Sequence, residues 1–277
     1  MSLYIEVAGS GEPIVMLHGW GMHGGIWGEA LDRLTQDFKV CRVDLPGHGK
    51  SPFQPEEYEW KDGGQGTLVR QRERAVKLLD MIVGQLSAQF HNPVTLCGWS
   101  LGGIIAQHWA AREPDKIRRL VLVSSTPCFA EHDGWPYGMA RELLEQFASD
   151  LKKNHTATLR RFLGLQVRGS EDERELMARL RKSLFSHGEP HLDALRAGLE
   201  ILHDADLRAE LPNIRQATLV IAGERDKLTS PKASHYLAQT MPNARFVEIR
   251  GAAHAPFLSH SDEFVQHMMD FLNEKQA

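Results

Sequence analysis

One serine stands between glycines where two sequence patterns meet. The apolar run 93–98 precedes Ser100, and the amphipathic run 101–112, which lacks proline, follows it. A strand that turns sharply into a helix would hold this hydroxyl above a sheet edge, and small neighbours are needed because the helix backbone passes close to the strand. The stretch GWSLG at 98–102 therefore predicts a nucleophile at Ser100. The alternative is a serine that only caps the helix.

A serine hydroxyl becomes a nucleophile when a histidine accepts its proton and a carboxylate orients that histidine. When the serine sits on a strand-to-helix turn, the acid and then the histidine follow later in the chain. Asp226 ends the run 216–226, and His254 ends the run 244–254. We predict that His254 accepts the proton of Ser100 and that Asp226 fixes its tautomer. Rival acids are Glu224, Asp204 and Asp206.

The negative charge that develops during such an attack needs N–H donors nearby. One predicted donor is the N–H of Leu101, at the start of a helix whose N-terminus favours negative charge. The other is the N–H of Trp20 in the loop HGWG at 18–21. The alternative is a glycine-rich loop without a catalytic role. No phosphate-binding pattern and no regular spacing of metal ligands accompanies it, so we expect no cofactor and no metal.

The elements that position these residues follow from hydrophobic periodicity. Short apolar runs alternate with longer amphipathic ones, which predicts an α/β fold with a mostly parallel sheet between helices. Predicted strands are 13–19, 38–47, 93–98, 118–125, 216–226 and 244–254. Predicted helices are 26–36, 67–90, 101–112, 231–240 and 260–273.

The middle of the chain shows a different pattern. Between about 128 and 210 every amphipathic run has helical periodicity. A helical block between two parts of a parallel sheet is typical of a cap over an active site. We therefore expect a core of 1–127 and 211–277 with an inserted helical cap at 128–210. The polar segment 51–66, rich in glycine, is predicted to be a surface loop.

Composition limits the class of protein. The 277 residues can form a full core, and the net charge of −4 argues against nucleic-acid binding. Three cysteines, an odd number, predict free thiols in a reducing compartment. No secretion signal and no apolar run of membrane-spanning length is present. We expect a cytoplasmic monomer that binds neither nucleic acid nor membrane.

Five motifs occur in the order typical of the α/β-hydrolase superfamily, which the chain resembles over nearly its whole length outside the cap. They are HGWG, VDLPGHGKS, GWSLGG, GERD and GAAHAPF. Within the superfamily, the chain is most similar to the carboxylesterases of biotin synthesis, which hydrolyse the methyl ester of pimeloyl-acyl carrier protein. That closer resemblance rests on GWSLGG, SSTPCF, RFLGLQ, GLEILHDADLR and AAHAPFLSHSDEF.

The resemblance implies the α/β-hydrolase fold, a triad of Ser100, Asp226 and His254, and catalysis without a cofactor. It implies that Trp20 and Leu101 supply the oxyanion amides. It also implies a substrate channel lined by Trp20 and the segment 162–166, with Phe162, Leu165 and Gln166 as lining residues. The loop at 51–66 is longer than the family's usual connection, so one edge of the pocket is expected to differ.

The predicted cap carries a local excess of positive charge. Between 151 and 170 there are five lysines and arginines and no acidic residue. A basic rim would steer an acidic partner such as an acyl carrier protein, and the resemblance implies this docking role for Arg161 and Arg174. The alternative is an ordinary solvated helix face.

Two other functions stay open: a broad esterase of small soluble esters, and a ligand-binding module without turnover.

Overall fold

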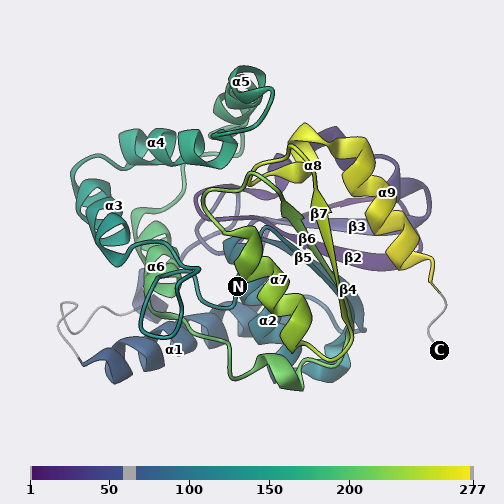
Figure 1. Cartoon of the computed structure of the whole chain (residues 1–277), viewed down its shortest axis with the longest axis horizontal. Helices are drawn as coiled ribbons and strands as arrows, with labels where there is room; N and C mark the ends of the chain where they lie inside the picture. Colours follow the sequence, from purple (N-terminus) through teal and green to yellow (C-terminus); the bar gives the residue numbers. More distant parts are fainter. Residues whose placement is uncertain (1, 59–66, 275–277) are drawn as a thin grey trace.

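The computed structural model describes residues 2–58 and 67–274, in which one seven-stranded sheet forms the centre (Figure 1). The strand order is β1-β3-β2-β4-β5-β6-β7, and only the β1–β3 pair is antiparallel. The expected α/β class with a mostly parallel sheet is confirmed. The strands are β1 (Ile5–Ala8), β2 (Glu12–Leu17), β3 (Phe38–Val43), β4 (Val94–Trp99), β5 (Ile117–Val123), β6 (Ala217–Gly223) and β7 (Ala244–Ile249).

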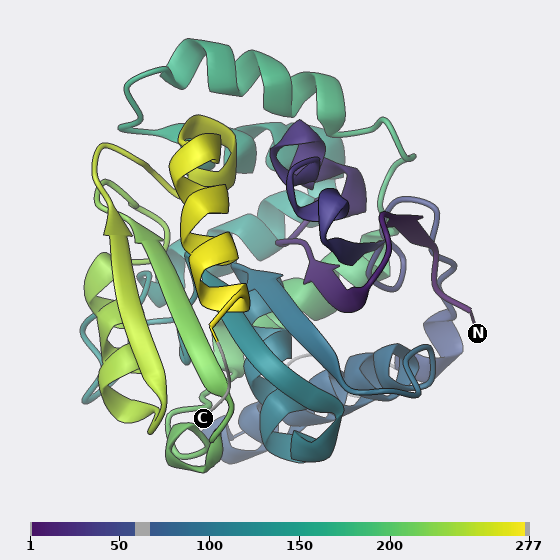
Figure 2. The ribbon, with the colours of Figure 1, turned by 90° about the vertical axis from the view of Figure 1, so that its right-hand side faces the viewer.

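Helices cover both faces of this sheet (Figure 2). One face carries α1 (Leu68–Ser87), α2 (Leu101–Arg112) and α7 (Pro231–Thr240). The other face carries α9 (Ser261–Leu272), which packs against a 3₁₀ segment at Gly24–Leu31 and follows the short α8 (Pro256–Ser259). Because both faces are covered, every residue of β4 is buried, which explains why its sequence is apolar except for Thr95.

One local expectation was wrong, and one strand was missed. The run 26–36 forms no α-helix but two 3₁₀ segments, Gly24–Leu31 and Leu34–Gln36. Gly28 has φ of +56° inside the first segment and interrupts helical geometry there. Strand β1 was not predicted, since it is a four-residue edge strand without a buried face.

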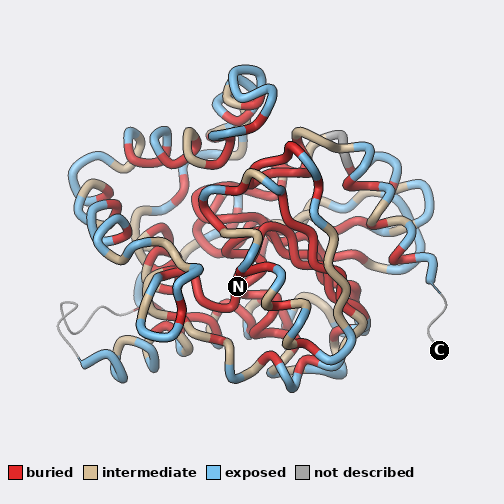
Figure 3. Tube along the Cα trace, in the orientation of Figure 1, coloured by how far each residue is buried: buried red, intermediate tan, exposed pale blue. Residues whose placement is uncertain are grey.

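Four helices lie between β5 and β6, where the sequence predicted a helical block. They are α3 (Arg141–Lys153), α4 (His155–Val167), α5 (Glu173–Ser183) and α6 (Leu192–Asp204). Helix α6 packs against α1, while α3, α4 and α5 extend away from the sheet (Figure 1). Buried and exposed residues alternate along α3–α5, as expected for helices with one covered face (Figure 3). The boundaries of the cap at 128 and 210 stay a prediction.

The segment 51–66 is only partly described, because residues 59–66 lie outside the described part of the chain. The described half is not a simple surface loop, which corrects the expectation for it. It contains a 3₁₀ turn at Pro55–Tyr58, and Tyr58 is only 4% exposed. Phe53 stacks on His191 at the start of α6, with ring centroids 4.7 Å apart. This half of the segment therefore joins the core to α6.

The three cysteines are free and buried, as the odd count predicted. Burial raises the pKa of Cys97 and raises that of Cys128 to about 12, so both thiols stay protonated.

None of the helices in the described residues has the length and apolar character that a membrane span requires.

A buried histidine connects α2, the helix that follows Ser100, to α1 and to Glu210. His108 on α2 is fully buried, and its two ring nitrogens lie 2.8 Å from Asp80 on α1 and 3.3 Å from Glu210. Burial disfavours a charged imidazole, but the hydrogen bonds to Glu210 and Asp80 outweigh it, so the pKa of His108 is raised. The charged form of His108 therefore links three segments of the chain.

This link makes stability depend on pH. Because the folded-state pKa is raised, the stabilisation is fully present below the unfolded pKa of about 6.5 and is lost as pH rises through the folded pKa. We expect His108→Gln to lower the free energy of unfolding by about 1–3 kcal/mol at low pH and by less at high pH. Urea titrations of both proteins at about pH 6 and pH 9 measure the difference. A gap that widens with pH would contradict this role.

Candidate active site

The turn at Ser100 has the strained geometry that the sequence predicted. Ser100 is the N-cap of α2 with φ of +56°, a conformation that non-glycine residues rarely adopt. A Cβ at Gly98 would lie 2.2 Å from the Gly102 carbonyl oxygen, and one at Gly102 would lie 2.3 Å from the Leu17 carbonyl oxygen. Neither position has room for a side chain. The strand and helix therefore meet closely enough to project Ser100 from the sheet edge.

The loop after β2 lies directly beside this turn. A Cβ built at Gly19 would lie 3.3 Å from Cβ of Ser100. Within the described residues, the backbone N–H groups of Trp20 and Leu101 have no hydrogen-bond acceptor. Two free donors beside a candidate nucleophile are what an oxyanion hole requires. The assignment of Trp20 and Leu101 to that hole stays a prediction that this geometry supports.

His18 holds this loop in place, a role the sequence did not reveal. Its Nε2 accepts a hydrogen bond from the N–H of Leu45 at 3.0 Å, so its Nδ1 carries the proton and donates to the Gly19 carbonyl at 2.8 Å. Burial lowers the pKa of His18 well below its usual value, so the ring stays neutral. The loops after β2 and β3 are thereby tied together.

Asp226 and His254 form a buried hydrogen-bonded pair. His254 Nδ1 lies 2.8 Å from one carboxylate oxygen of Asp226, and the other oxygen accepts from the N–H groups of Leu228 and Thr229, both at 2.9 Å. These donors fix the carboxylate, which in turn fixes the imidazole with its proton on Nδ1. The pair follows β6 and β7, whose carboxyl ends lie at the same sheet edge as that of β4.

The rival acids have other partners. Glu224 accepts from the N–H of Gly251 at 2.9 Å. Asp204 pairs with Arg141 at 3.1 Å, and Asp206 pairs with Arg208. Of the four candidates, only Asp226 bonds the histidine.

His254 Nε2 is buried and has no hydrogen-bond partner among the described residues. No hydrogen bond joins it to the hydroxyl of Ser100 in this structure. The turn that carries Ser100 nevertheless contacts the histidine loop, because the indole of Trp99, the residue before Ser100, bonds the backbone carbonyl of His254. Catalytic hydrogen bonds are often long without substrate and tighten in the reacting complex. The free Nε2 is the atom that proton transfer from Ser100 requires.

Helices α4 and α6 contact the candidate site through Trp20 and the predicted channel residues. The indole of Trp20 donates to the Leu195 carbonyl at 2.8 Å, and Phe162 packs edge-on against it with centroids 4.8 Å apart. The backbone carbonyl of Gln166 accepts from the N–H of His254 at 3.2 Å, and Leu165 is half-buried beside it. The segment 162–166 thus contacts both the oxyanion loop and the histidine loop. Its role in lining a channel stays a prediction.

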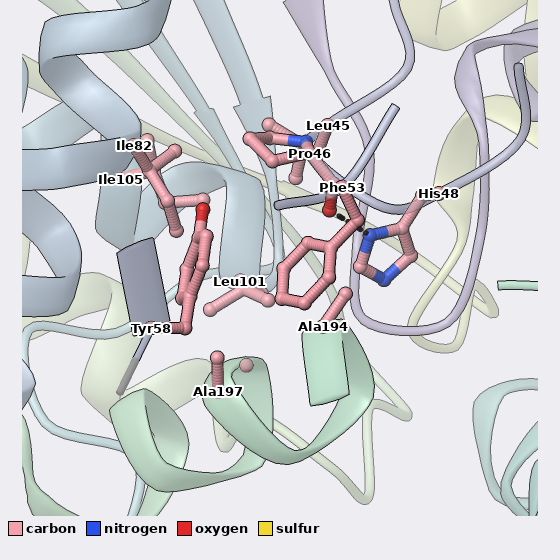
Figure 4. A pocket seen from close by; sticks show the side chains of 11 residues that line it. Leu45, Pro46, His48, Phe53, Tyr58, Ile82, Leu101, Ile105, Ala194 and Ala197 are labelled. Carbon is pink, nitrogen blue, oxygen red and sulfur yellow. Dashed lines mark hydrogen bonds between the residues drawn. The ribbon is translucent and has the colours of Figure 1, made fainter. Parts of the chain in front are cut away.

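A small, mainly apolar pocket adjoins Leu101 (Figure 4). It is enclosed by the loop after β3, by α1, α2 and α6, and by the described part of the segment 51–66. Burial lowers the pKa of its one histidine, His48, to about 4, so that ring stays neutral. The lining residues are Leu45, Pro46, His48, Phe53, Tyr58, Ile82, Leu101, Ile105, Ala194, Ala197 and Gly198.

Two clusters have side chains of the kind that bind metals. His23, Asp44 and His187 form one, with ligand atoms within 4.8 Å of one another. Its groups already have protein partners: His23 bonds the Ser183 carbonyl, and Asp44 accepts from backbone N–H groups of Gly24 and Lys50. This cluster joins the loops after β2 and β3 to the end of α5.

The second cluster consists of Cys128, His132 and Asp206. Arg208 donates two hydrogen bonds of 2.8 Å to the Asp206 carboxylate and lies 3.2 Å from His132. A guanidinium therefore lies where a cation would have to bind. Neither cluster touches the Asp226–His254 pair.

The two predicted docking arginines differ in their surroundings. Arg161 pairs with Asp150 at 2.9 Å, and its guanidinium lies 4.5 Å above the Phe147 ring. Asp150 directly precedes the basic segment 151–170 that contains Arg161. Arg174 on α5 is exposed and makes no ion pair with any described residue. Arg174 is therefore the freer of the two for a partner.

A model of the alpha/beta hydrolase fold family matches residues 12–261, and the chain belongs to this family. The resemblance drawn from the motifs is thereby confirmed. The chain is 41% identical over 277 residues to the pimeloyl-[acyl-carrier protein] methyl ester esterase of Chromobacterium violaceum, covering 100% of both chains. It is 40% identical over 264 residues to the enzyme of the same name from Nitrosomonas europaea, covering 95% of this chain and 97% of the relative.

A solved structure gives the same fold. The bromoperoxidase from Bacillus anthracis superposes with a TM-score of 0.83 at 23% identity, covering 98% of this chain and 95% of the other. At this identity the likeness concerns the fold alone.

Proposed function

We propose that this protein is a serine carboxylesterase that hydrolyses the methyl ester of pimeloyl-acyl carrier protein. The carrying observation is the buried Asp226–His254 hydrogen bond, with a free Nε2 beside the strained turn at Ser100. The substrate follows from full-length relatives at 40–41% identity that bear that name.

The reaction uses two half-reactions at one serine. Ser100 Oγ attacks the ester carbonyl while His254 Nε2 takes its proton, and the N–H groups of Trp20 and Leu101 stabilise the oxyanion. The carbon–oxygen bond to the methoxy group breaks, and His254 returns the proton so that methanol leaves. A water molecule, deprotonated by His254, then attacks the acyl-enzyme. The bond from the acyl carbon to Ser100 Oγ breaks, and His254 gives the proton to Oγ, which releases the free acid and restores the hydroxyl.

The carrier protein docks on the face formed by α4 and α5 in this proposal. Helix α4 carries Arg161 and also the segment 162–166 that contacts the site, so docking there would place the acyl arm near Ser100. We further propose that the protein works as a cytoplasmic monomer and binds neither nucleic acid nor membrane.

Removing the docking charges tests the partner. We expect Arg174→Ala to lower kcat/KM for the carrier-linked ester by roughly 3- to 10-fold, and less at high salt, because a rim charge acts mainly on association. Arg161→Ala should have a smaller effect through charge, since Asp150 already neutralises it.

The matched control is Arg70→Ala, an exposed arginine on α1, which lies away from α4 and α5 (Figure 1). Turnover of a small soluble ester should be the same in all three variants. Equal losses on the small and the carrier-linked ester would contradict docking by these arginines.

Mass spectrometry of pimeloyl methyl ester on its carrier tests the proposed function itself. After incubation with the purified protein, the carrier should carry the free acid, and methanol should appear in equal amount. Hydrolysis of small esters with the carrier-linked ester untouched would favour the broad esterase. A protein that neither turns over an ester nor reacts with a fluorophosphonate would favour the binding module.

A further inference from the structure

Trp99 links the nucleophile turn to the histidine loop. It is the residue before Ser100, and its side chain is fully buried. Its indole N–H donates a 2.8 Å hydrogen bond to the backbone carbonyl of His254, and the two rings lie 5.6 Å apart. One residue of the turn that carries the nucleophile therefore holds the main chain of the general base.

The rest of His254 is held from other directions. Its backbone N–H donates to the Gln166 carbonyl on α4, and its Nδ1 bonds Asp226. Every polar atom of His254 except Nε2 therefore has a partner. Among these partners, Trp99 is the only one on the same turn as Ser100, so it alone couples the position of the base directly to that of the nucleophile.

We infer that Trp99 is a positioning residue, whose indole N–H sets the distance and direction from His254 Nε2 to Ser100. This inference rests on the proposed function. The ring itself is oriented by packing, with Phe257 at 5.0 Å and Trp27 at 6.4 Å between centroids. Packing and hydrogen bonding are therefore separable: Trp99→Phe keeps an aromatic ring but leaves the buried His254 carbonyl without its donor.

The effect falls on steps in which His254 moves a proton. A misplaced base costs as much as about 100-fold in rate, because proton transfer depends steeply on geometry. Methoxide leaves only with a proton from His254, whereas p-nitrophenolate is stable enough to leave without one. We therefore expect Trp99→Phe to lower kcat for a methyl ester by roughly 10- to 100-fold, and for a p-nitrophenyl ester by clearly less, with little change in KM.

Trp27→Phe is the matched control. Trp27 is fully buried in the same aromatic cluster, but its indole N–H has no hydrogen-bond partner among the described residues. Both substitutions remove the same ring volume, but only Trp99→Phe also leaves a buried carbonyl without a donor, so we expect Trp99→Phe to lower Tm more. Only Trp99→Phe should change the ratio of the two ester rates. If Trp99→Phe does not fold, Trp99→Tyr keeps more of the bulk and still lacks the indole N–H.

The results of these rate measurements distinguish a failure of the Trp99 role from a failure of the proposed function. Suppose the unsubstituted protein hydrolyses both esters. Equal kcat for the methyl ester in the Trp99 and Trp27 variants then overturns the role of Trp99 alone. A protein without substitutions that hydrolyses neither ester overturns the proposed function and this role with it.

Discussion

Ser100→Ala is expected to lower kcat by roughly 10⁴- to 10⁶-fold, because no other group can form the acyl-enzyme. The protein should remain folded. The native serine adopts φ of +56°, which costs on the order of 1–3 kcal/mol for a residue with a Cβ. Ser100→Gly should therefore be equally inactive and yet more stable than Ser100→Ala, since glycine adopts this conformation without strain.

Hydrolysis of p-nitrophenyl esters and labelling by a fluorophosphonate measure this loss, and urea titration measures stability. Ser124→Ala is the matched control. Ser124 also follows a buried strand and also has a positive φ, of +45°, and its own buried hydroxyl has no partner in the described residues. It should keep both activity and labelling. Full activity in Ser100→Ala would remove the nucleophile from the proposed mechanism.

Asp226→Asn should lower kcat by about 10³- to 10⁴-fold with little change in fold. The oxygen that accepts from Leu228 and Thr229 is expected to stay an oxygen in the amide, because both partners are N–H donors. The amide NH₂ then faces His254 Nδ1 and forces the proton onto Nε2. A histidine with its proton on Nε2 cannot accept one from Ser100.

The pH–rate profile and a double variant give the decisive readouts. Adding Asp226→Asn to Ser100→Ala should cost almost nothing further, because the residues of a triad act as a unit. Glu224→Gln is the control, since Glu224 follows the same strand but bonds Gly251 instead of the histidine. An Asp226→Asn protein that retains more than about a tenth of its kcat would assign the acid role elsewhere.

Sequence patterns predicted the central strands of the sheet well because these strands are buried on both faces. β4 is apolar except for Thr95, β5 is continuously apolar from Leu120 to Val123, and turn residues mark their ends. The pattern failed where tertiary contacts override periodicity. The run 26–36 is amphipathic enough for a helix, yet its glycine at 28 and its packing against α9 leave only 3₁₀ turns.

The candidate catalytic residues could be predicted from their order along the chain. The serine turn and the order of acid and base indicate a triad, and the structure places Asp226 on His254. Long-range hydrogen bonds leave no trace in periodicity, which is why the roles of His18 and Trp99 were missed. The basic segment 151–170 overstates the local positive charge, because Asp150, one residue before it, pairs with Arg161.

The position of the four inserted helices has a consequence for synthesis. They separate β5 from β6, so the ribosome finishes the serine turn more than a hundred residues before it reaches His254. Nascent chains fold from the amino end, and β6 and β7 can join the sheet only at its open β5 edge. In the proposed mechanism, the general base is thus the last member of the triad to be synthesised, and we expect a chain released before residue 254 to hydrolyse no ester.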